Sequence, residues 1–504
     1  MLLKEALDQI PGIHLEGKPD TQISGISYDS RSVREGDLFV AIKGEKTDGA
    51  RFVRQAVDRG AAAIASEQRV ECEAHTAGLI VPDGRKFLAE VSRVFFGDPC
   101  SKLQLVAITG TNGKTTASCM MDSLYSQAGI LSCLVGTLGM KIGARSYHSE
   151  HTTPEAPDLM RFLNQAVAEG CTHGALEVSS HSLALKRVFG ARFHVGIFMN
   201  LTRDHLDFHK DMESYYQAKK QLFMPENGNR VEFAVINADD SYGRRLREEI
   251  SCSALSFGFS QPAEIYVLES RNRADGTDLA LATPGGEIRF RTRLIGRPNV
   301  YNIMAATGAA LCQGIGLDRI RHGIESLKGV PGRVELVDAG QDFTVIVDYA
   351  HSPDALENLL KTVSQLPHKK LITLFGCGGN RDRTKRPIMG EIAARLSDLV
   401  LATSDNPRSE NPLDILKEIE PGLRKGPAPY EIIPDRRQAI ESAVFMACPD
   451  DVVVIAGKGH EDYQIVGDRV LPFDDRKLAG ELIRERLKAE EARRQGELNA
   501  NGRP

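Results

Sequence analysis

A glycine-rich segment carries the strongest chemical signal in the sequence. In VAITGTNGKTTAS an apolar run ends at Thr109, a glycine turn follows, and Lys114 with two threonines opens a helical pattern. The N–H groups of such a turn and of the helix N-terminus form a cradle for an anion. Lys114 is placed to reach the β- and γ-phosphates of a nucleotide, and Thr115 to direct a hydroxyl at Mg²⁺. The predicted phosphate loop comprises Gly110, Thr111, Asn112, Gly113, Lys114, Thr115 and Thr116.

The spacing of this loop is shorter than the usual G-x-x-x-x-G-K-[ST] pattern. A plain glycine turn that caps a helix is therefore the alternative interpretation. The order of strand, glycines, lysine and two threonines favours phosphate binding.

Two side chains that bind metals in proteins also follow apolar strand candidates. Glu177 ends the strand of GALEVSS, and His205 lies just past HVGIFMN. The carboxyl ends of parallel strands meet at one edge of a sheet, so both residues are expected beside the phosphate loop. A carboxylate and an imidazole there can complete a Mg²⁺ site that bridges ATP oxygens. Taken alone, His205 is more typical of a loop or packing histidine.

Two further motifs have ordinary structural interpretations. Lys219 lies in the helical stretch MESYYQAKKQLF, where a surface lysine is the preferred interpretation. Asn299 and Asn302, in RPNVYN, stand at the start of a helix, which is typical of N-caps. Amide hydrogen bonds to a nucleotide are the other interpretation of the two asparagines.

The elements that position these residues alternate between strands and helices. Apolar runs of strand length separated by helices indicate parallel sheets covered on both faces, hence an α/β fold. Four such runs in the last third each lead into a polar loop with Gly or Pro: FTVIVDYAHSP, KKLITLFGCGG, DLVLATSDNPR and DVVVIAGKGHE. Open sheets bind ligands at that edge.

The length and composition bound the class of protein. A chain of 504 residues exceeds one hydrophobic core and predicts about three domains. The net charge of −5 gives no basic field for nucleic acid or anionic lipid. Nine scattered cysteines, an acidic N-terminus interrupted by Pro11 and the lack of a long apolar run predict a cytoplasmic protein without membrane insertion.

With the phosphate loop, Glu177, His205, RPNVYN, GRVE and DYAHSP in this order, the chain resembles the Mur ligase family, which builds the peptide stem of peptidoglycan. The resemblance covers the chain except its charged tail. It implies a UDP-binding α/β domain at 1–100, a central P-loop ATPase-type parallel-sheet domain at 101–330 and a Rossmann-like amino-acid-binding domain at 331–490. Residues 491–504 are expected to form a charged, disordered tail.

The resemblance also assigns residues to ligands. Beside the loop, ATP is held by Asn299, Asn302, Arg333 and Asp348. Lys114, Lys219 and His205 are implied as catalytic, with Thr115, Glu177, His205 and a carbamylated Lys219 as magnesium ligands; Lys220 is the alternative lysine. The UDP-linked substrate is assigned to Tyr28, Ser30, Thr152, Thr153, Ser179 and Arg187. Leu185 departs from the pattern where a Gln is usual.

The motif SDNPR carries the prediction of which amino acid is added. The far end of meso-diaminopimelate is a zwitterion, for which Arg408 offers a planar fork to the carboxylate and Glu461 an acceptor for the ammonium. Lysine lacks that carboxylate, and a site built around it can reject lysine by about 10⁴. Pro407 is expected to stiffen this loop, although a polar turn is the alternative interpretation. The predicted site comprises Arg381, Asp405, Asn406, Pro407, Arg408, Gly457 and Glu461, and Asn380 stands where Asp is usual.

The implied reaction is ATP-dependent amide formation between meso-diaminopimelate and the D-glutamate of UDP-N-acetylmuramoyl-L-alanyl-D-glutamate through an acyl phosphate. Mg²⁺ is the expected cofactor, ATP the co-substrate, and a monomer the expected state. A folylpolyglutamate synthase is the nearest enzymatic alternative. A P-loop hydrolase or kinase and a non-catalytic nucleotide-binding relative are the others.

Overall fold

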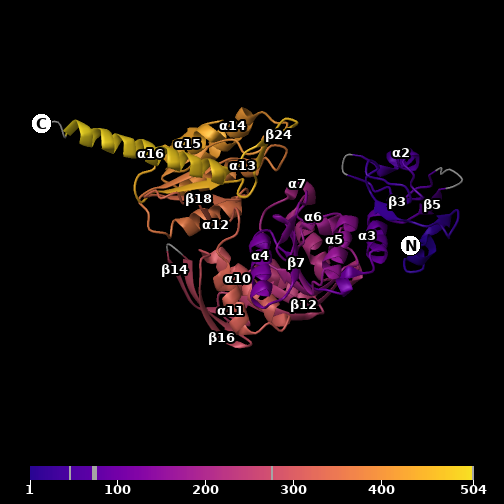
Figure 1. The fold of residues 1–504 in the computed structure, drawn as a ribbon. Coiled ribbons are helices and arrows are strands. Elements are labelled where there is room, and N and C mark those ends of the chain that lie inside the picture. The colour runs from indigo at the N-terminus through magenta and orange to yellow at the C-terminus, as the bar shows by residue number, and fades with distance from the viewer. Residues whose placement is uncertain (45–46, 71–75, 274–275, 502–504) are drawn as a thin grey trace.

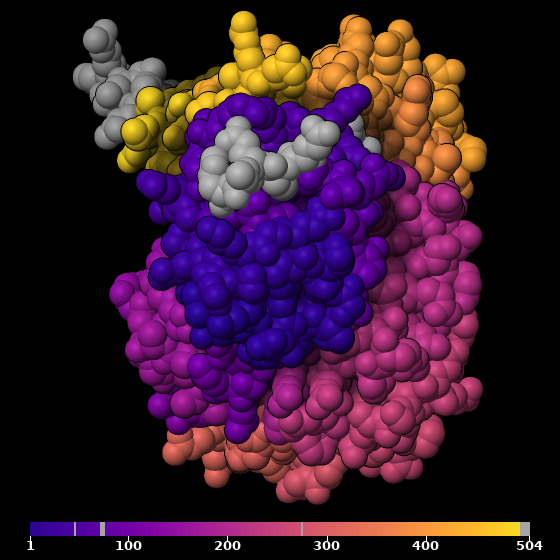
Figure 2. Space-filling model, turned by 90° about the vertical axis from the view of Figure 1, so that its right-hand side faces the viewer, coloured from indigo at the N-terminus to yellow at the C-terminus, as the bar shows by residue number. Residues whose placement is uncertain are grey.

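The structure is a computed structural model that describes residues 1–44, 47–70, 76–273 and 276–501. The chain forms three α/β domains in sequence order, each built around its own sheet (Figure 1). The central domain lies between the other two. Figure 2 views the molecule from the side of the N-terminal domain, with the C-terminal domain along the top.

The N-terminal domain contains a five-stranded sheet of order β1-β5-β4-β3-β2, in which only β1 is antiparallel. The apolar segments DLFVAI and AAAIAS contain β3 and β4, and the segment after Ala50 contains α2. The bounds are β1 (His14–Glu16), β2 (Gly25–Ser27), β3 (Asp37–Val40), β4 (Ala63–Ser66), β5 (Ala77–Ile80), α1 (Leu3–Leu7), α2 (Val53–Asp58) and α3 (Gly84–Phe95).

The central domain contains an eleven-stranded sheet whose middle is parallel, as the apolar runs predict. Helices α4, α10 and α11 cover one face, and α5, α6 and α8 the other. Strands β15 and β16 form an antiparallel hairpin at one end of this sheet. The strands are β6 (Gln104–Thr109), β7 (Ser132–Gly136), β8 (Gly139–Ile142), β9 (Arg145–Tyr147), β10 (His173–Glu177), β11 (Arg192–Phe198), β12 (Arg230–Asn237), β13 (Ser253–Gly258), β14 (Ile265–Arg273), β15 (Gly276–Thr283) and β16 (Gly286–Thr292). The helices are α4 (Lys114–Gln127), α5 (Ala156–Ala168), α6 (Ser180–Ala184), α7 (Leu206–His209), α8 (Met212–Lys220), α9 (Ser241–Glu249), α10 (Arg297–Cys312) and α11 (Leu317–Ser326).

The C-terminal domain contains a six-stranded sheet of order β17-β18-β22-β19-β20-β21, antiparallel only at β17. All four predicted strand-to-loop runs therefore end at one edge. Helices α12, α13 and α14 pack on one face, and α15 and α16 on the other. The bounds are β17 (Glu335–Leu336), β18 (Thr344–Asp348), β19 (Leu371–Phe375), β20 (Leu399–Ala402), β21 (Tyr430–Ile432), β22 (Val452–Ala456), β23 (Tyr463–Val466), β24 (Arg469–Pro472), α12 (Pro353–Val363), α13 (Lys385–Leu396), α14 (Pro412–Leu423), α15 (Arg436–Met446) and α16 (Asp475–Asn501).

The charged tail expected at 491–504 begins as a continuation of helix α16. Helix α16 starts at Asp475 and continues to Asn501, while residues 502–504 lie outside the described part of the chain. Its first half is anchored by Leu478, Leu482 and Ile483, which are buried against α15. A helix that is already nucleated extends at little cost through residues of good helix propensity, such as those of KAEEARRQ. No helix within the described residues is long and apolar enough to cross a membrane.

Candidate functional site

The phosphate loop connects β6 to α4 and depends on two glycines with left-handed backbones. Gly110 has φ 156° and Gly113 φ 89°. A Cβ atom on Gly110 would lie 2.6 Å from Cβ of Met199, and one on Gly113 would lie 2.3 Å from Oδ1 of Asn302. The first N–H groups of α4 have no intrahelical acceptor, so they remain directed at the loop. The interpretation as a plain capping turn does not explain this crowding of both glycines.

Two lysines converge on one carbonyl oxygen of this loop. Lys114 donates from Nζ to the carbonyl oxygens of Gly110 and Thr111, both at 2.9 Å, and Lys219 donates to Gly110 at 2.9 Å. Only 1% of Lys219 is exposed, so the surface interpretation is wrong. Lys220, the alternative, points away and pairs with Glu249 at 2.9 Å. Burial, and then the Lys114 ammonium, lower the pKa of Lys219 well below its usual value.

The predicted metal ligands lie at the same sheet edge. Glu177 is paired in register with Ile108 of β6, and its Oε2 accepts a hydrogen bond from Thr115 at 3.0 Å. His205 follows β11, and its Nε2 lies 3.5 Å from Oδ2 of Asp204. Burial lowers the pKa of His205 to about 3, which keeps the imidazole neutral and able to bind a metal. Among the described residues no three His, Cys, Asp or Glu side chains group tightly enough to hold a metal alone.

A cavity of about 330 Å³ extends from the loop into the junction of the central and C-terminal domains. Its walls include all the predicted nucleotide residues beyond the loop: Asn299, Asn302, Arg333 and Asp348. Arg333 donates to Oγ1 of Thr115 at 3.4 Å, and its guanidinium lies 4.7 Å from the ring centre of Tyr349.

The N-cap interpretation of the two asparagines is wrong. Gly296 occupies the N-cap of α10 without a side-chain cap. Asn299 donates to the carbonyl of Ile295 at 2.9 Å, and Asn302 donates to Oδ1 of Asn299 at 3.1 Å. Both amides are buried against the nucleotide cavity, where only part of their hydrogen-bonding capacity is used by these bonds.

The residues predicted for the UDP-linked substrate fall into two groups. Tyr28 and Ser30 line a cavity of about 550 Å³ in the N-terminal domain. The hydroxyl of Tyr28 also donates to Asp158 of α5 at 2.7 Å, and Ser30 donates to Gln55 at 2.7 Å. Tyr28 therefore joins its cavity to the central domain.

The second group lies between α5 and α6 in the central domain. Thr153 donates to the carbonyl of Glu177 at 2.8 Å, and Arg187 donates to the carbonyl of Thr153 at 3.0 Å. Ser179 caps α6, and Thr152 lies 3.1 Å from the Thr137 hydroxyl, which donates to Glu177 at 2.9 Å. The Thr137 hydroxyl thus links Thr152 of the second group to the carboxylate of Glu177 beside the phosphate loop.

The predicted amino-acid site is assembled from three strand-end loops. Arg408 has φ 52° and donates from Nη1 to the carbonyl of Gly379 at 2.9 Å. A Cβ atom on Gly378 would lie 2.9 Å from Nη1 of Arg408 and 3.8 Å from Cγ of Arg381, so the glycine leaves room for both arginines. Burial, and then Arg381, lower the pKa of Arg408. Gly457 has φ 118° and lies against Asp405.

The hairpin β23–β24 holds the SDNPR loop in addition to the stiffness expected of Pro407. The backbone N–H of Arg408 donates to Ile465 at 3.0 Å, and Gln464 donates to the carbonyl of Asp405 at 2.7 Å. The Ile465 N–H donates to Oδ1 of Asn406 at 3.0 Å. The SDNPR loop is therefore fixed by a segment that the sequence analysis does not single out.

Glu461 is not a vacant acceptor. Its Oε2 accepts from Lys458 at 3.0 Å and from Asn406 at 2.9 Å, and the Tyr349 hydroxyl lies 3.5 Å from Oε1. Lys458 is fully buried and was missed, because a lysine between two glycines in GKGHE reads as a loop residue. Asn380 has φ 53°, which Asn tolerates well, and its Oδ1 accepts from Ser409 at 2.9 Å.

Three family models match the chain in sequence order: "Mur ligase family, catalytic domain" over residues 22–96, "Mur ligase middle domain" over 108–310 and "Mur ligase, glutamate ligase domain" over 332–459. The chain is 44% identical over 474 residues to the UDP-N-acetylmuramoyl-L-alanyl-D-glutamate–2,6-diaminopimelate ligase of Syntrophomonas wolfei, with 94% of this chain and 97% of that protein covered. It is 44% identical to the protein of that name from Geobacillus thermodenitrificans, with 96% and 100% covered.

Two solved structures share the arrangement. A UDP-N-acetylmuramoyl-L-alanyl-D-glutamate–2,6-diaminopimelate ligase matches with a TM-score of 0.69 at 32% identity, covering 96% of this chain and 99% of that one. The MurF ligase of Thermotoga maritima in complex with ADP matches with a TM-score of 0.62 at 20% identity, covering 94% and 99%, and shows the fold alone.

Proposed function

The chain belongs to the Mur ligase family, and we propose that it couples meso-diaminopimelate to the D-glutamate of UDP-N-acetylmuramoyl-L-alanyl-D-glutamate at the expense of ATP. The reaction is a step of peptidoglycan precursor synthesis. It is proposed to take place in the cytoplasm, where its nucleotide substrates are made, on a monomer.

The convergence of three candidate sites on the phosphate loop carries this proposal. Thr152 and Thr137 lead from the central-domain substrate residues to Glu177 and Thr115. On the other side, Arg333 stacks on Tyr349, whose hydroxyl faces Glu461 of the amino-acid site. An acid, a triphosphate and an amine held at these three places are brought together for sequential transfer.

The chain's own residues account for the main tasks of each step. In the first step the γ-phosphoryl group moves from ATP to the glutamate side-chain carboxylate, giving an acyl phosphate and ADP. Lys114 is placed to neutralise charge on the phosphates, and the α4 N-terminus to bind them. In the second step the diaminopimelate amine attacks the acyl carbon, phosphate leaves, and the amide forms with loss of a proton from the amine. Burial between the domains excludes water, which would otherwise hydrolyse the acyl phosphate.

The donor set beside the loop fits magnesium. Thr115 and Glu177 offer hard oxygen donors, and the small number of protein ligands suits an ion that takes its other ligands from phosphates and water. His205 supplies a neutral imidazole. When bound, Mg²⁺ would neutralise phosphate charge and orient the transferred group.

Lys219 is proposed to be carbamylated. Its lowered pKa favours the uncharged amine, which adds to carbon dioxide and loses a proton to give an anionic carbamate. That change converts the lysine that shares the Gly110 carbonyl with Lys114 into a group that can bind a metal.

Specificity for diaminopimelate is attributed to the paired arginines. Nη1 of Arg408 and the stem of Arg381 lie beside Gly378, and the charge of Arg381 is close enough to lower the pKa of Arg408, so the pair suits a carboxylate. Glu461 shares its Oε2 between Lys458 and Asn406, so Oε1, which the Tyr349 hydroxyl approaches only to 3.5 Å, is the oxygen better placed to accept from the distal ammonium.

The test is product formation by the purified full-length protein with ATP, magnesium and the UDP-linked dipeptide, with meso-diaminopimelate or L-lysine added. Amide product and phosphate release that both require diaminopimelate are expected, and Lys114→Ala should reduce both at least 100-fold. Lys220→Ala is the matched control, because Lys220 pairs with Glu249 away from the loop. Phosphate release without any amine would indicate a hydrolase, and equal use of lysine would exclude the specificity proposed here.

A further inference from the structure

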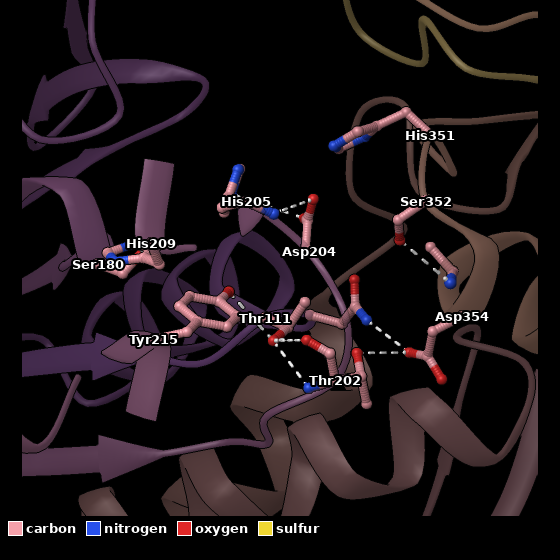
Figure 3. A network of polar contacts seen from close by, with 12 residues as sticks. Thr111, Ser180, Thr202, Asp204, His205, His209, Tyr215, His351, Ser352 and Asp354 are labelled. Atoms are coloured by element: carbon pink, nitrogen blue, oxygen red, sulfur yellow. Dashed lines mark hydrogen bonds and ion pairs between the residues drawn. The ribbon is translucent and has the colours of Figure 1, made fainter. Parts of the chain in front are cut away.

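One carboxylate of the C-terminal domain reaches across to the phosphate loop. Asp354 is the second residue of α12, after the N-cap Ser352 and Pro353. A carboxylate at this position commonly accepts from the helix's own N–H groups. Here Oδ2 instead accepts from Nδ2 of Asn112 at 2.8 Å and from Oγ1 of Thr202 at 3.0 Å, both in the central domain. Figure 3 shows Asp354 directed from its helix at Thr202.

Both partners of Asp354 are fixed to the phosphate loop. The backbone N–H of Asn112 donates to Oδ1 of Asn200 at 2.9 Å, and Asn200 donates back to the Asn112 carbonyl at 3.2 Å. The backbone N–H of Thr202 donates to Oγ1 of Thr111 at 3.0 Å, and that hydroxyl lies 3.2 Å from the Thr202 carbonyl. A single oxygen atom therefore bridges the phosphate loop and the segment after β11 that leads to His205.

Other hydrogen bonds between described residues of these two domains are weaker by geometry or by charge, as between the neutral amides of Asn272 and Gln365 at 3.1 Å. Arg333 reaches Thr115 at 3.4 Å, near the limit of a hydrogen bond, and Arg203 donates to a neutral hydroxyl of Thr384 at 2.9 Å on an exposed surface. The bonds to Asp354 are short, partly buried and made to a charged acceptor, which makes such bonds stronger than neutral ones.

We propose that Asp354 is a positioning residue that couples docking of the C-terminal domain to the shape of the phosphate loop, so that nucleotide binding and amino-acid binding favour each other. The amino-acid site and Asp354 belong to one domain, packed on the sheet that carries β18 and β20. A ligand that stabilises the docked arrangement of the domains must raise the affinity for any second ligand that binds this arrangement preferentially. The second ligand raises the affinity for the first by the same factor.

The inference rests on the proposed function, because diaminopimelate is the amino acid used to measure the coupling. Loss of the hydrogen bonds to a charged acceptor should change the equilibrium constant for docking of the C-terminal domain by about tenfold or more. The measured quantity is the Kd of the imido analogue of ATP with magnesium and the UDP-linked dipeptide, with and without saturating meso-diaminopimelate, determined by calorimetry on full-length protein.

In the wild-type protein diaminopimelate should tighten binding of the analogue at least tenfold. Asp354→Ala should reduce this factor to below about threefold, while Kd without diaminopimelate changes little. Glu357→Ala is the matched control on the same helix, because Glu357 pairs with Lys361 and Arg395 inside its own domain, and it should keep the wild-type factor.

Asp354→Asn gives a second variant of the same shape if the alanine protein does not fold; its amide oxygen is a weaker acceptor, so an intermediate factor is expected. Full coupling in a folded Asp354 variant would overturn the inference, and so would a wild-type protein without coupling. Equal weakening of the analogue with and without diaminopimelate would mean that Asp354 binds nucleotide directly, which also overturns it. Product formation by the wild-type enzyme is measured separately, so that failure of the proposed function can be distinguished from failure of the inference about Asp354.

Discussion

Replacement of Arg436 should both destabilise the C-terminal domain and loosen its amino-acid site. Arg436 and Asp475 are paired with no exposed side-chain surface, at 2.6 and 2.8 Å. Arg436 also donates to the carbonyls of Ser404 at 3.2 Å and Ala456 at 3.1 Å. Those carbonyls immediately precede Asp405 and Gly457, so one guanidinium joins the bases of two loops of the proposed amino-acid site.

The magnitude follows from what Arg436→Met leaves behind. Asp475 would stay buried without its cation, and two carbonyl oxygens would lose a donor. Breaking a buried pair in this way costs about 3–5 kcal/mol. Replacing both partners, in Arg436→Met with Asp475→Leu, removes the unpaired charge and should restore about half or more of that loss. The two loops would still lack their common donor, so the KM for diaminopimelate should stay raised about tenfold in the double variant.

Hydrogen exchange of peptides covering β20 and β22 measures the local stability, and steady-state kinetics measure KM for diaminopimelate and for ATP. Arg436→Met should speed exchange in both strands, the double variant should reverse most of that change, and the KM for ATP should hardly move. The reasoning would be refuted if the double variant were no more stable than the single one. It would also be refuted if the double variant bound diaminopimelate as well as the wild type.

Three shorter predictions concern single positions. Gly113→Ala should lower kcat/KM for ATP at least 100-fold without unfolding the protein. The added methyl would lie 2.3 Å from Oδ1 of Asn302, and the backbone at this position has φ 89°. Near-normal kinetics with an unchanged circular dichroism spectrum would contradict this prediction. Arg408→Ala should bring the ratio of diaminopimelate to lysine product close to one, and a retained preference would remove Arg408 from that role. Burial lowers the pKa of His209 to about 4 from 6.5, so the unfolded chain takes up this proton at a higher pH than the folded protein does. The free energy of unfolding should therefore fall by about 1–2 kcal/mol as the pH drops from about 6.5 to about 4. His209→Gln should flatten that part of a series of urea-unfolding measurements against pH, and an unchanged slope would exclude His209 as the cause.

The sequence predicts best where backbone and periodicity decide the outcome. The apolar runs before Thr109 and Glu177 indicate parallel strands, and the structure places both ends at one edge. The sequence predicts burial less well for a helix whose packing partners lie elsewhere in the chain. Lys219 reads as a surface residue because MESYYQAKKQLF has polar residues on both sides, and only the packing of α8 against the sheet buries it.

Contacts between residues far apart in the chain are the part that no local pattern reveals. Asp354 follows a proline at a helix start, where a carboxylate needs no further explanation, and Arg436 directly follows the N-cap Asp435. Their partners lie far away in the chain, at Asn112 and Asp475. Such pairings depend on strand order and domain placement, which hydrophobic periodicity does not encode.

The arrangement of Lys114 and Lys219 suits an anion at the phosphate loop. Both Nζ atoms donate to the single Gly110 carbonyl oxygen, and burial lowers the pKa of each. Two ammonium charges this close would repel strongly, so the uncharged amine of Lys219 relieves the repulsion when no ligand is bound. A triphosphate would give Lys114 a better acceptor than its own loop, and a carbamate on Lys219 would place an anionic group where the neutral amine stands. The pair is therefore expected to favour nucleotide binding at the junction of the central and C-terminal domains.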